Sequence, residues 1–164
     1  MAPFIRPGAA LAEIETVYRL RFSEFCAVAA AILHDRERAR DAVQEAFAKA
    51  VRERRDYRRE GAIDAWLWRV VVNSALTERR KQTTNAGPDR SENGATHDEA
   101  GRDDVRAAIQ SLPERQRLVV FLRYWADLDY QTIADVLAIA PGTVAASLHA
   151  AHRSVRSRLQ EVHT

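Results

Sequence analysis

A polar segment near the middle of the chain limits what this protein can fold into. Residues 82–101 read QTTNAGPDRSENGATHDEAG and contain no aromatic and no branched aliphatic side chain. Such a segment has no apolar surface whose burial would offset the entropy lost when it becomes ordered. We therefore predict two folded bodies, residues 1–81 and 104–164, joined by a flexible acidic linker over residues 82–103.

Apolar residues in the first body recur at steps of three and four, which is the period of amphipathic helices. The pattern predicts a helix from Leu11 to about Leu33 and a second from the N-cap Asp35 to near Arg55. A third is predicted from Ile63 to residues 79–81, with Trp66 facing the core and Trp68 between the core and the polar side. Three such helices close one small core.

The second body is expected to be helical too. Ser111 to Glu114 has the S-x-x-E form of a capping box and predicts a helix start, with Trp125 among the buried residues that follow. Asp129 is placed to cap a short helix, and a long helix begins at Pro141. A short helix, a tight turn and a long helix outline a helix-turn-helix. The predicted fold class is all-α, with two small helical domains.

Several classes of function are disfavoured by what the sequence lacks. A single cysteine, Cys26, forms no internal disulfide or cysteine metal cage, and its apolar neighbours indicate a buried small hydrophobe. His149 and His152 have the spacing of two metal ligands but no third ligand nearby, so we expect no metal, no cofactor and no catalytic residue. The longest apolar run, residues 25–33, is far short of the roughly 20 residues that span a bilayer, and no signal peptide is evident. We expect a cytoplasmic protein without membrane insertion.

The net charge of +2 conceals an uneven distribution. Residues 1–81 hold 16 Lys and Arg against 12 Asp and Glu, and residues 105–164 hold 7 against 5. Residues 82–104 hold 2 against 6. Two basic bodies flanking an acidic connector fit nucleic-acid binding, and they fit an ordinary solvated surface equally well.

Four short motifs, in order, resemble the extracytoplasmic-function (ECF) group of bacterial sigma factors. Residues 40–47 (RDAVQEAF) resemble that family's D-L-V-Q-E-x-F segment, and residues 65–73 (AWLWRVVVN) resemble A-W-L-x-R-I-A-x-N. Residues 112–117 (LPERQR) resemble L-P-x-x-x-R, and residues 130–134 (YQTIA) resemble Y-x-E-I-A. The resemblance covers nearly the whole chain. It implies a factor, monomeric when free, that directs core RNA polymerase to promoter DNA and that an anti-sigma factor often sequesters.

Asp41, Gln44 and Glu45 stand at i, i+3 and i+4 of the second predicted helix, so they share one face. We call these three residues the acidic stripe. The resemblance implies that they bind core polymerase. The alternative is that the carboxylates only pair with neighbouring arginines on a wet surface, where ion pairs contribute ~0–1 kcal/mol.

The third predicted helix carries polar residues on the side opposite its core face. These are Arg69, Asn73, Thr77 and Arg80, which we call the minus-ten stripe. The resemblance implies that the stripe and the loop 57–62, with Arg58 and Arg59, read the minus-ten element as melted strand, with Asn73 contacting a base. A plainer role for residues 79–81 is to complement the dipole at the end of their helix.

The last helix is the expected reader of the minus-thirty-five element. Its candidate DNA contacts are Thr143, Ala145, Ala146, Ser147, His149 and Arg153, with Arg156 less certain. The family commonly shows Gly in the turn and T-V-K-S-R-L in the helix, whereas this chain has Ala138 and TVAASL. The missing cationic side chains predict weak upstream binding. Two alternatives stay open: a stand-alone helix-turn-helix regulator, and an interaction protein that has lost promoter recognition.

Overall fold

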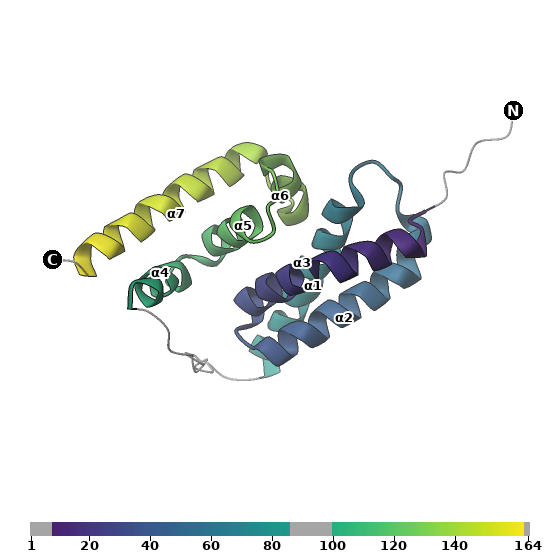
Figure 1. The fold of residues 1–164 in the computed structure, drawn as a ribbon, viewed down its shortest axis with the longest axis horizontal. Helices are drawn as coiled ribbons and strands as arrows, with labels where there is room; N and C mark the ends of the chain where they lie inside the picture. Colours follow the sequence, from purple (N-terminus) through teal and green to yellow (C-terminus); the bar gives the residue numbers. More distant parts are fainter. Residues whose placement is uncertain (1–7, 86–99, 163–164) are drawn as a thin grey trace, which may run out of the picture.

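The computed structural model describes residues 8–85 and 100–162. Every regular element in these two ranges is a helix, and the elements are α1 (Leu11–Leu33), α2 (Arg36–Glu53), the 3-10 turn η1 (Arg54–Asp56), α3 (Ile63–Asn85), α4 (Ala100–Gln110), α5 (Glu114–Tyr124), α6 (Tyr130–Leu137) and α7 (Pro141–Val162). Helices α1 to α3 form one domain and α4 to α7 the other (Figure 1). The all-α prediction with two helical domains is confirmed.

Helices cover both ends of the linker that was predicted over residues 82–103. Residues 82–85 continue α3 past its expected end, and residues 100–103 already belong to α4. The rest of the predicted linker, residues 86–99, lies outside the described residues.

The core of the first domain is built on aromatic side chains from all three helices. Phe25 of α1 lies with its ring centroid 5.1 Å from that of Phe47 and 4.1 Å from that of Trp68. Trp68 is fully buried, while Trp66 is only partly buried and packs beside Tyr57. Trp66 therefore packs at the edge of the core, and Trp68, expected between the core and the polar side, is the tryptophan that the core encloses. Because Leu67, Trp68, Val71 and Val72 are all buried, the inward face of α3 is rotated from the predicted one.

Two of the predicted helix caps are present and one is not. The Asp35 carboxylate accepts the Arg38 N–H at 3.0 Å, and the Asp129 carboxylate accepts the Thr132 N–H at 2.7 Å. The capping box at Ser111 is wrong, because α5 begins one residue after the N-cap Pro113 and the Ser111 hydroxyl donates to the Ala108 carbonyl oxygen. Pro113 has no side-chain oxygen with which to cap the helix.

Helices α6 and α7 form the predicted helix-turn-helix around Ile133, Val144 and Leu148, all of them buried. Ala138 ends α6 in the left-handed region, at φ 54°.

The prediction that Trp125 is buried is wrong. Trp125 is 50% exposed, because it lines an apolar groove of about 760 Å³ between α4, α5 and α7.

The two domains pack against each other in this structure. Helix α5 lies beside α1, and α6 lies beside α3 (Figure 1). Polar contacts join them, since Arg79 pairs with Glu114 and the Arg21 guanidinium donates to the Ala126 carbonyl oxygen.

No single helix in the described ranges is long and apolar enough to cross a membrane. Helices α6 and α7 meet the criteria of length and composition only when taken together, as a pair bent by 102°.

Candidate functional site

A groove of about 370 Å³ runs between α2 and α3 on the first domain. Asp41 and Glu45 line its α2 side, and Asn73 and Thr77 line its α3 side. The structure therefore places two residues of the acidic stripe and two of the minus-ten stripe on the walls of one groove, while Gln44, Arg69 and Arg80 are not part of its lining. Lys49 also lines it, and its position one turn after Glu45 is the sequence signal that would have found it.

The acidic stripe is accessible on α2. Asp41, Gln44 and Glu45 are all exposed, because the buried face of α2 consists of Ala39, Ala42, Val43, Ala46, Phe47 and Ala50. Glu45 pairs with Arg52 at 3.1 Å, where the two side chains remain 71% and 62% exposed. Such a pair contributes ~0–1 kcal/mol, so a basic partner can displace Arg52 at little cost.

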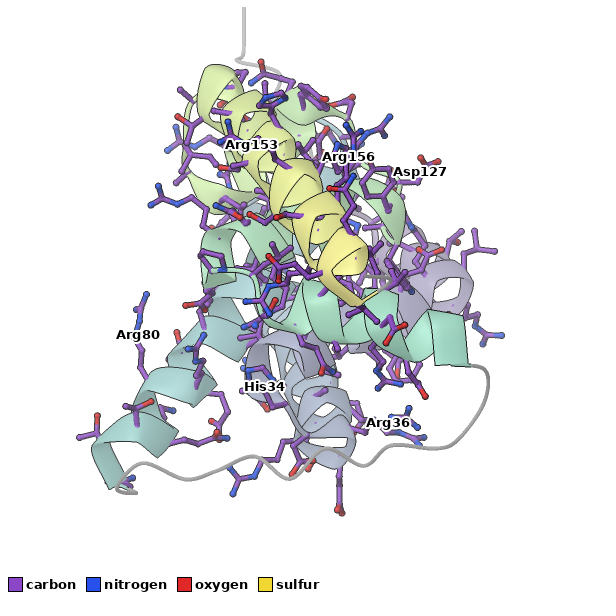
Figure 2. The ribbon with its side chains drawn as sticks, turned by 90° about the vertical axis from the view of Figure 1, so that its left-hand side faces the viewer. His34, Arg36, Arg80, Asp127, Arg153 and Arg156 are labelled. Carbon is purple, nitrogen blue, oxygen red and sulfur yellow. The ribbon has the colours of Figure 1, made fainter. Side chains whose placement is uncertain are left out.

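The minus-ten stripe faces away from the core of the first domain. Arg69, Asn73, Thr77 and Arg80 are all exposed. Arg80 points away from the body of the protein (Figure 2). Arg69 instead donates from Nε and Nη2 to the Asp135 carbonyl oxygen, at 3.0 and 2.7 Å. The second domain thus occupies one end of the stripe in this arrangement.

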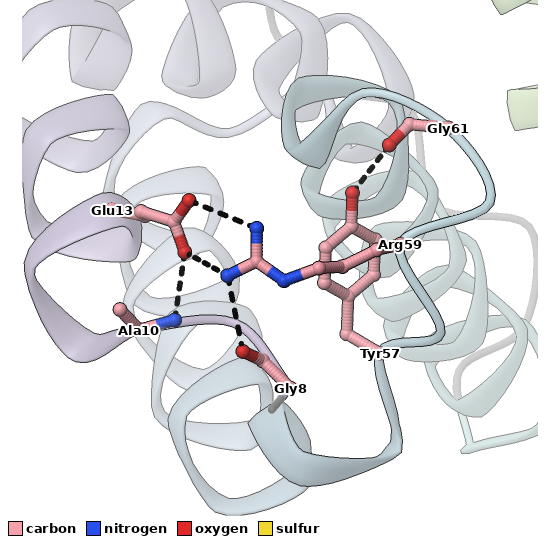
Figure 3. Close-up of polar contacts among 6 residues, drawn as sticks. All are labelled: Gly8, Ala10, Glu13, Tyr57, Arg59 and Gly61. Atoms are coloured by element: carbon pink, nitrogen blue, oxygen red, sulfur yellow. Dashed lines mark hydrogen bonds and ion pairs between the residues drawn. The ribbon is translucent and has the colours of Figure 1, made fainter. Parts of the chain in front are cut away.

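The two arginines predicted to bind DNA from the loop 57–62 have different surroundings. Arg58 is exposed. Arg59 turns toward α1, where its guanidinium meets the Glu13 carboxylate at 2.9 and 3.3 Å (Figure 3). A hydrogen bond from the Ala10 N–H and the adjacent Arg59 hold the pKa of Glu13 below its usual range. The loop is therefore fastened to the start of α1.

The outer face of α7 carries most of the predicted upstream contacts. Ala145, Ala146, His149 and Arg153 are exposed, and Thr143 is half-buried. Ser147 is only 9% exposed and lies on the inward face of α7 with Val144 and Leu148. We therefore leave Ser147 out of the proposed DNA surface. Arg153 and Arg156 both project from the α7 helix (Figure 2).

The remaining candidates for chemistry show no assembled site. The described residues contain no group of three or more His, Cys, Asp and Glu side chains arranged to hold a metal ion. The hydroxyl of Tyr124 and Nε2 of His152 lie 2.8 Å apart in a hydrogen bond. Cys26 is partly buried against the core, and this burial raises the pKa of its thiol, which disfavours the nucleophilic thiolate.

Family models match both domains. Residues 18–84 match sigma-70 region 2, and residues 102–155 match sigma-70 region 4. The first match spans the groove, both stripes and the loop, and the second spans the helix-turn-helix. Because both domains match, the alternative of a stand-alone regulator is not favoured.

Curated relatives match over most of their length. The RNA polymerase sigma-H factor of Pseudomonas aeruginosa is 31% identical over 147 residues, covering 78% of this chain and 76% of the relative. The ECF RNA polymerase sigma-E factor of Escherichia coli K12 is 31% identical over 139 residues, covering 73% of each protein.

Two solved structures share the fold. The sigma factor RpoE, crystallised with the anti-sigma factor NepR from Bartonella quintana, superposes with a TM-score of 0.77 at 20% identity, covering 92% of this chain and 98% of that one. CnrH, in complex with the cytosolic domain of CnrY, gives 0.70 at 16% identity, covering 93% and 91%. Family models, relatives and fold agree that this chain belongs to the sigma-70 family as an ECF-type sigma factor, which directs core RNA polymerase to promoters.

Proposed function

We propose that the first domain of this sigma factor docks on core polymerase through the acidic stripe and reads the melted minus-ten strand through the minus-ten stripe and Arg58. One observation carries the proposal. Asp41 and Glu45 are exposed on one wall of a groove and Asn73 and Thr77 on the other, so a polymerase surface seated on α2 lies directly beside Asn73 and Thr77. A single strand delivered along that surface meets an amide and a hydroxyl that hydrogen-bond base edges.

In this proposal the first domain provides binding energy rather than catalysis. Trapping an unstacked base stabilises the opened duplex, while the polymerase forms the phosphodiester bonds. This division of labour agrees with membership of a family of non-enzymatic initiation factors. In this proposal the protein acts in the cytoplasm, together with its polymerase.

The second domain binds the minus-thirty-five element with the outer face of α7. Its exposed candidates are Ala145, Ala146, His149 and Arg153, with Thr143 at the N-terminal end. Ala145 and Ser147 stand where the family motif T-V-K-S-R-L has Lys and Arg, and the absence of these cations makes this contact weak. The first domain therefore supplies much of the promoter affinity, and the second adds to it through the effective concentration that the linker sets.

An anti-sigma factor is a further proposed partner. The two solved neighbours are sigma factors held in complex, one with NepR and one with the cytosolic domain of CnrY. The match to each covers more than nine-tenths of this chain, which supports the proposal that the same fold is open to sequestration here.

The polymerase contact is tested by co-elution with core polymerase. Glu45→Lys reverses a charge in the acidic stripe, and we expect it to weaken core binding about tenfold or more, because one partner of a charged contact becomes repulsive. Glu53→Lys is the matched control, since Glu53 is exposed on the same helix but does not line the groove. Equal co-elution of wild type, Glu45→Lys and Gln44→Ala would refute docking through this stripe.

A further inference from the structure

The loop 57–62 is fastened at Arg59 to the beginning of α1. Nη2 of Arg59 lies 2.9 Å from Glu13 Oε2 and donates to the Gly8 carbonyl oxygen at 3.2 Å, while Nη1 donates to Glu13 Oε1 at 3.3 Å (Figure 3). The fork of the guanidinium thus meets both carboxylate oxygens. This two-point geometry fixes orientation as well as distance.

The backbone at Arg59 has a conformation that residues other than glycine rarely adopt. Its φ of 55° lies in the left-handed region, where a residue with a Cβ is disfavoured and glycine is not. A side chain persists there only where its surroundings hold it. The contacts with Glu13 and Gly8 are such surroundings.

The carboxylate end of this clamp is itself held in place. The Ala10 N–H donates to Glu13 Oε2 at 2.8 Å, and the Ala9 N–H donates to the Arg54 carbonyl oxygen at 2.8 Å. A Cβ on Gly8 would lie 2.1 Å from that same Arg54 oxygen, so only glycine allows the segment to pass this close to the end of α2. The start of α1 is therefore a fixed support for Arg59.

The rest of the loop is braced from the other side. The Tyr57 hydroxyl donates to the Gly61 carbonyl oxygen (Figure 3). The Tyr57 ring also packs on Trp66, with centroids 5.1 Å apart. With Tyr57 and Arg59 both turned to the protein, Arg58 and Glu60 are the charged side chains that the loop exposes. The clamp therefore decides which side chains the loop presents.

We propose that Glu13 and Arg59 are positioning residues that fix the loop 57–62 for minus-ten readout and thereby set base preference at the extruded position. Arg59, expected from the sequence to contact DNA, acts in this proposal through the loop. The inference rests on the proposed function of the loop. It adds that base specificity depends on Glu13 of α1, which is 46 positions from Arg59 in the sequence.

The test measures transcription by the reconstituted holoenzyme on promoters carrying each of the four bases at the minus-ten position that the wild type discriminates best. One base position typically carries roughly 5- to 150-fold discrimination. We expect Glu13→Ala to lower the discrimination to about twofold or less, with core co-elution within about twofold of wild type, because a mobile loop binds all four bases alike. Glu15→Ala is the matched control, since Glu15 is also on α1 and also paired, with Arg19.

Two further variants separate positioning from folding. Arg59→Gly removes the clamp but relieves the positive φ, so we expect native helical content with lost discrimination. The exchanged pair Glu13→Arg with Arg59→Glu restores opposite charges, and we expect it to recover at least part of the discrimination. Recovery would support positioning, because a side chain that only touched DNA would not be replaced by one of opposite charge.

Two results would overturn the inference. The first is unchanged discrimination in both Glu13→Ala and Arg59→Gly. The second is a loss of discrimination matched by an equal loss of core binding, which the exchanged pair does not recover. A wild-type holoenzyme that shows no base preference anywhere in the minus-ten element would overturn the proposed function instead.

Discussion

Arg69 of α3 donates two hydrogen bonds to the carbonyl oxygen of Asp135 in α6, at 3.0 and 2.7 Å. The donor belongs to the minus-ten stripe and the acceptor to the first helix of the helix-turn-helix. In the proposed function, Arg69 would bind DNA phosphate with the same N–H groups that it gives to this carbonyl. The proposal therefore implies that the packed arrangement of the two domains competes with binding at this end of the stripe.

We expect a substitution that weakens the contact between the domains to open the protein. Glu114 pairs with Arg79 across the interface, with the two side chains 39% and 36% exposed. An ion pair this exposed contributes ~0–1 kcal/mol, and reversing its charge costs a similar amount. Glu114→Lys should therefore shift the population of opened protein by up to about fivefold, measured as lower energy transfer between fluorophores on the two domains.

The control for this prediction is Glu161→Lys, an exposed charge reversal near the end of α7. It should leave the energy transfer unchanged. A Glu114→Lys protein as closed as wild type at low salt would show that the pair does not hold the domains together.

The backbone at Ala138, in the turn of the helix-turn-helix, is strained in a way that a glycine substitution would relieve. Ala138 has a φ of 54°, a conformation that costs a residue with a Cβ ~1–2 kcal/mol. Glycine avoids this cost but loses more entropy on folding, so the net gain is about 0.5–1 kcal/mol. We expect Ala138→Gly to raise the free energy of unfolding by that amount in urea denaturation.

Ala146→Gly tests whether this gain is specific to the left-handed position. Ala146 is exposed within α7 and is not among the residues with positive φ, so glycine there only adds unfolded-state entropy. We expect it to be destabilising by a few tenths to about 1 kcal/mol. Equal stabilisation by both variants would contradict the argument.

Restoring a cation to the outer face of α7 should strengthen upstream binding. Ala145 and Ala146 are exposed in the first turns of α7, so a longer side chain there meets no packed neighbour. A new charge-assisted hydrogen bond to phosphate contributes ~1.4 kcal/mol, or about tenfold in affinity. Ala145→Lys should show this gain, and the slope of log affinity against log salt should steepen by about 0.9.

A cation placed elsewhere provides the comparison. Ser23→Lys adds the same charge at an exposed position of α1, away from the helix-turn-helix. It should change neither the affinity for an isolated minus-thirty-five duplex nor its salt slope. A gain equal to that of Ala145→Lys would show that net charge, rather than position, controls binding.

The helical periods and the polar segment 82–101 carry enough information to predict the fold. Local rules fixed Asp35 and Asp129 as caps, because an N-cap contact involves residues only three positions apart. The burial of Trp68 instead of Trp66 was not predicted because the packing of α3 on α1 and α2 rotates its buried stripe toward Trp68 and Val72. The helical period of apolar residues in the sequence does not reveal how such packing rotates a helix.

The candidate site is only partly readable from the sequence. The acidic stripe and the minus-ten stripe each follow from helical spacing, but their meeting in one groove depends on how α2 packs beside α3. The inward turn of Arg59 depends on Glu13, which lies in another helix and in no recognisable motif. Ser147 was wrongly placed on the DNA surface. Its small polar side chain does not reveal that it shares the buried face of α7 with Val144 and Leu148.

The contact between the domains should also weaken in mild acid, through His34. His34 ends α1, where partial desolvation of its exposed ring, together with Arg117 and Arg79, holds its pKa below the usual value of 6.5, while Glu114 opposes them more weakly. Opening the domains removes both α5 residues, and because the effect of Arg117 exceeds that of Glu114, the pKa of His34 rises. The opened form thus binds the proton more tightly, so the stability of the closed form falls as the pH drops below about 6.5. At pH 7.5 and above His34 is neutral in both forms, and its contribution disappears.

Energy transfer between the domains should therefore decrease from pH 7.5 to 5.5 in the wild type. His34→Asn should abolish that dependence, because asparagine does not titrate and accepts the φ of 57° at this position. His152→Asn, which changes a histidine paired with Tyr124 on the second domain, should leave it intact, and an unchanged profile in His34→Asn would assign the titration to another group.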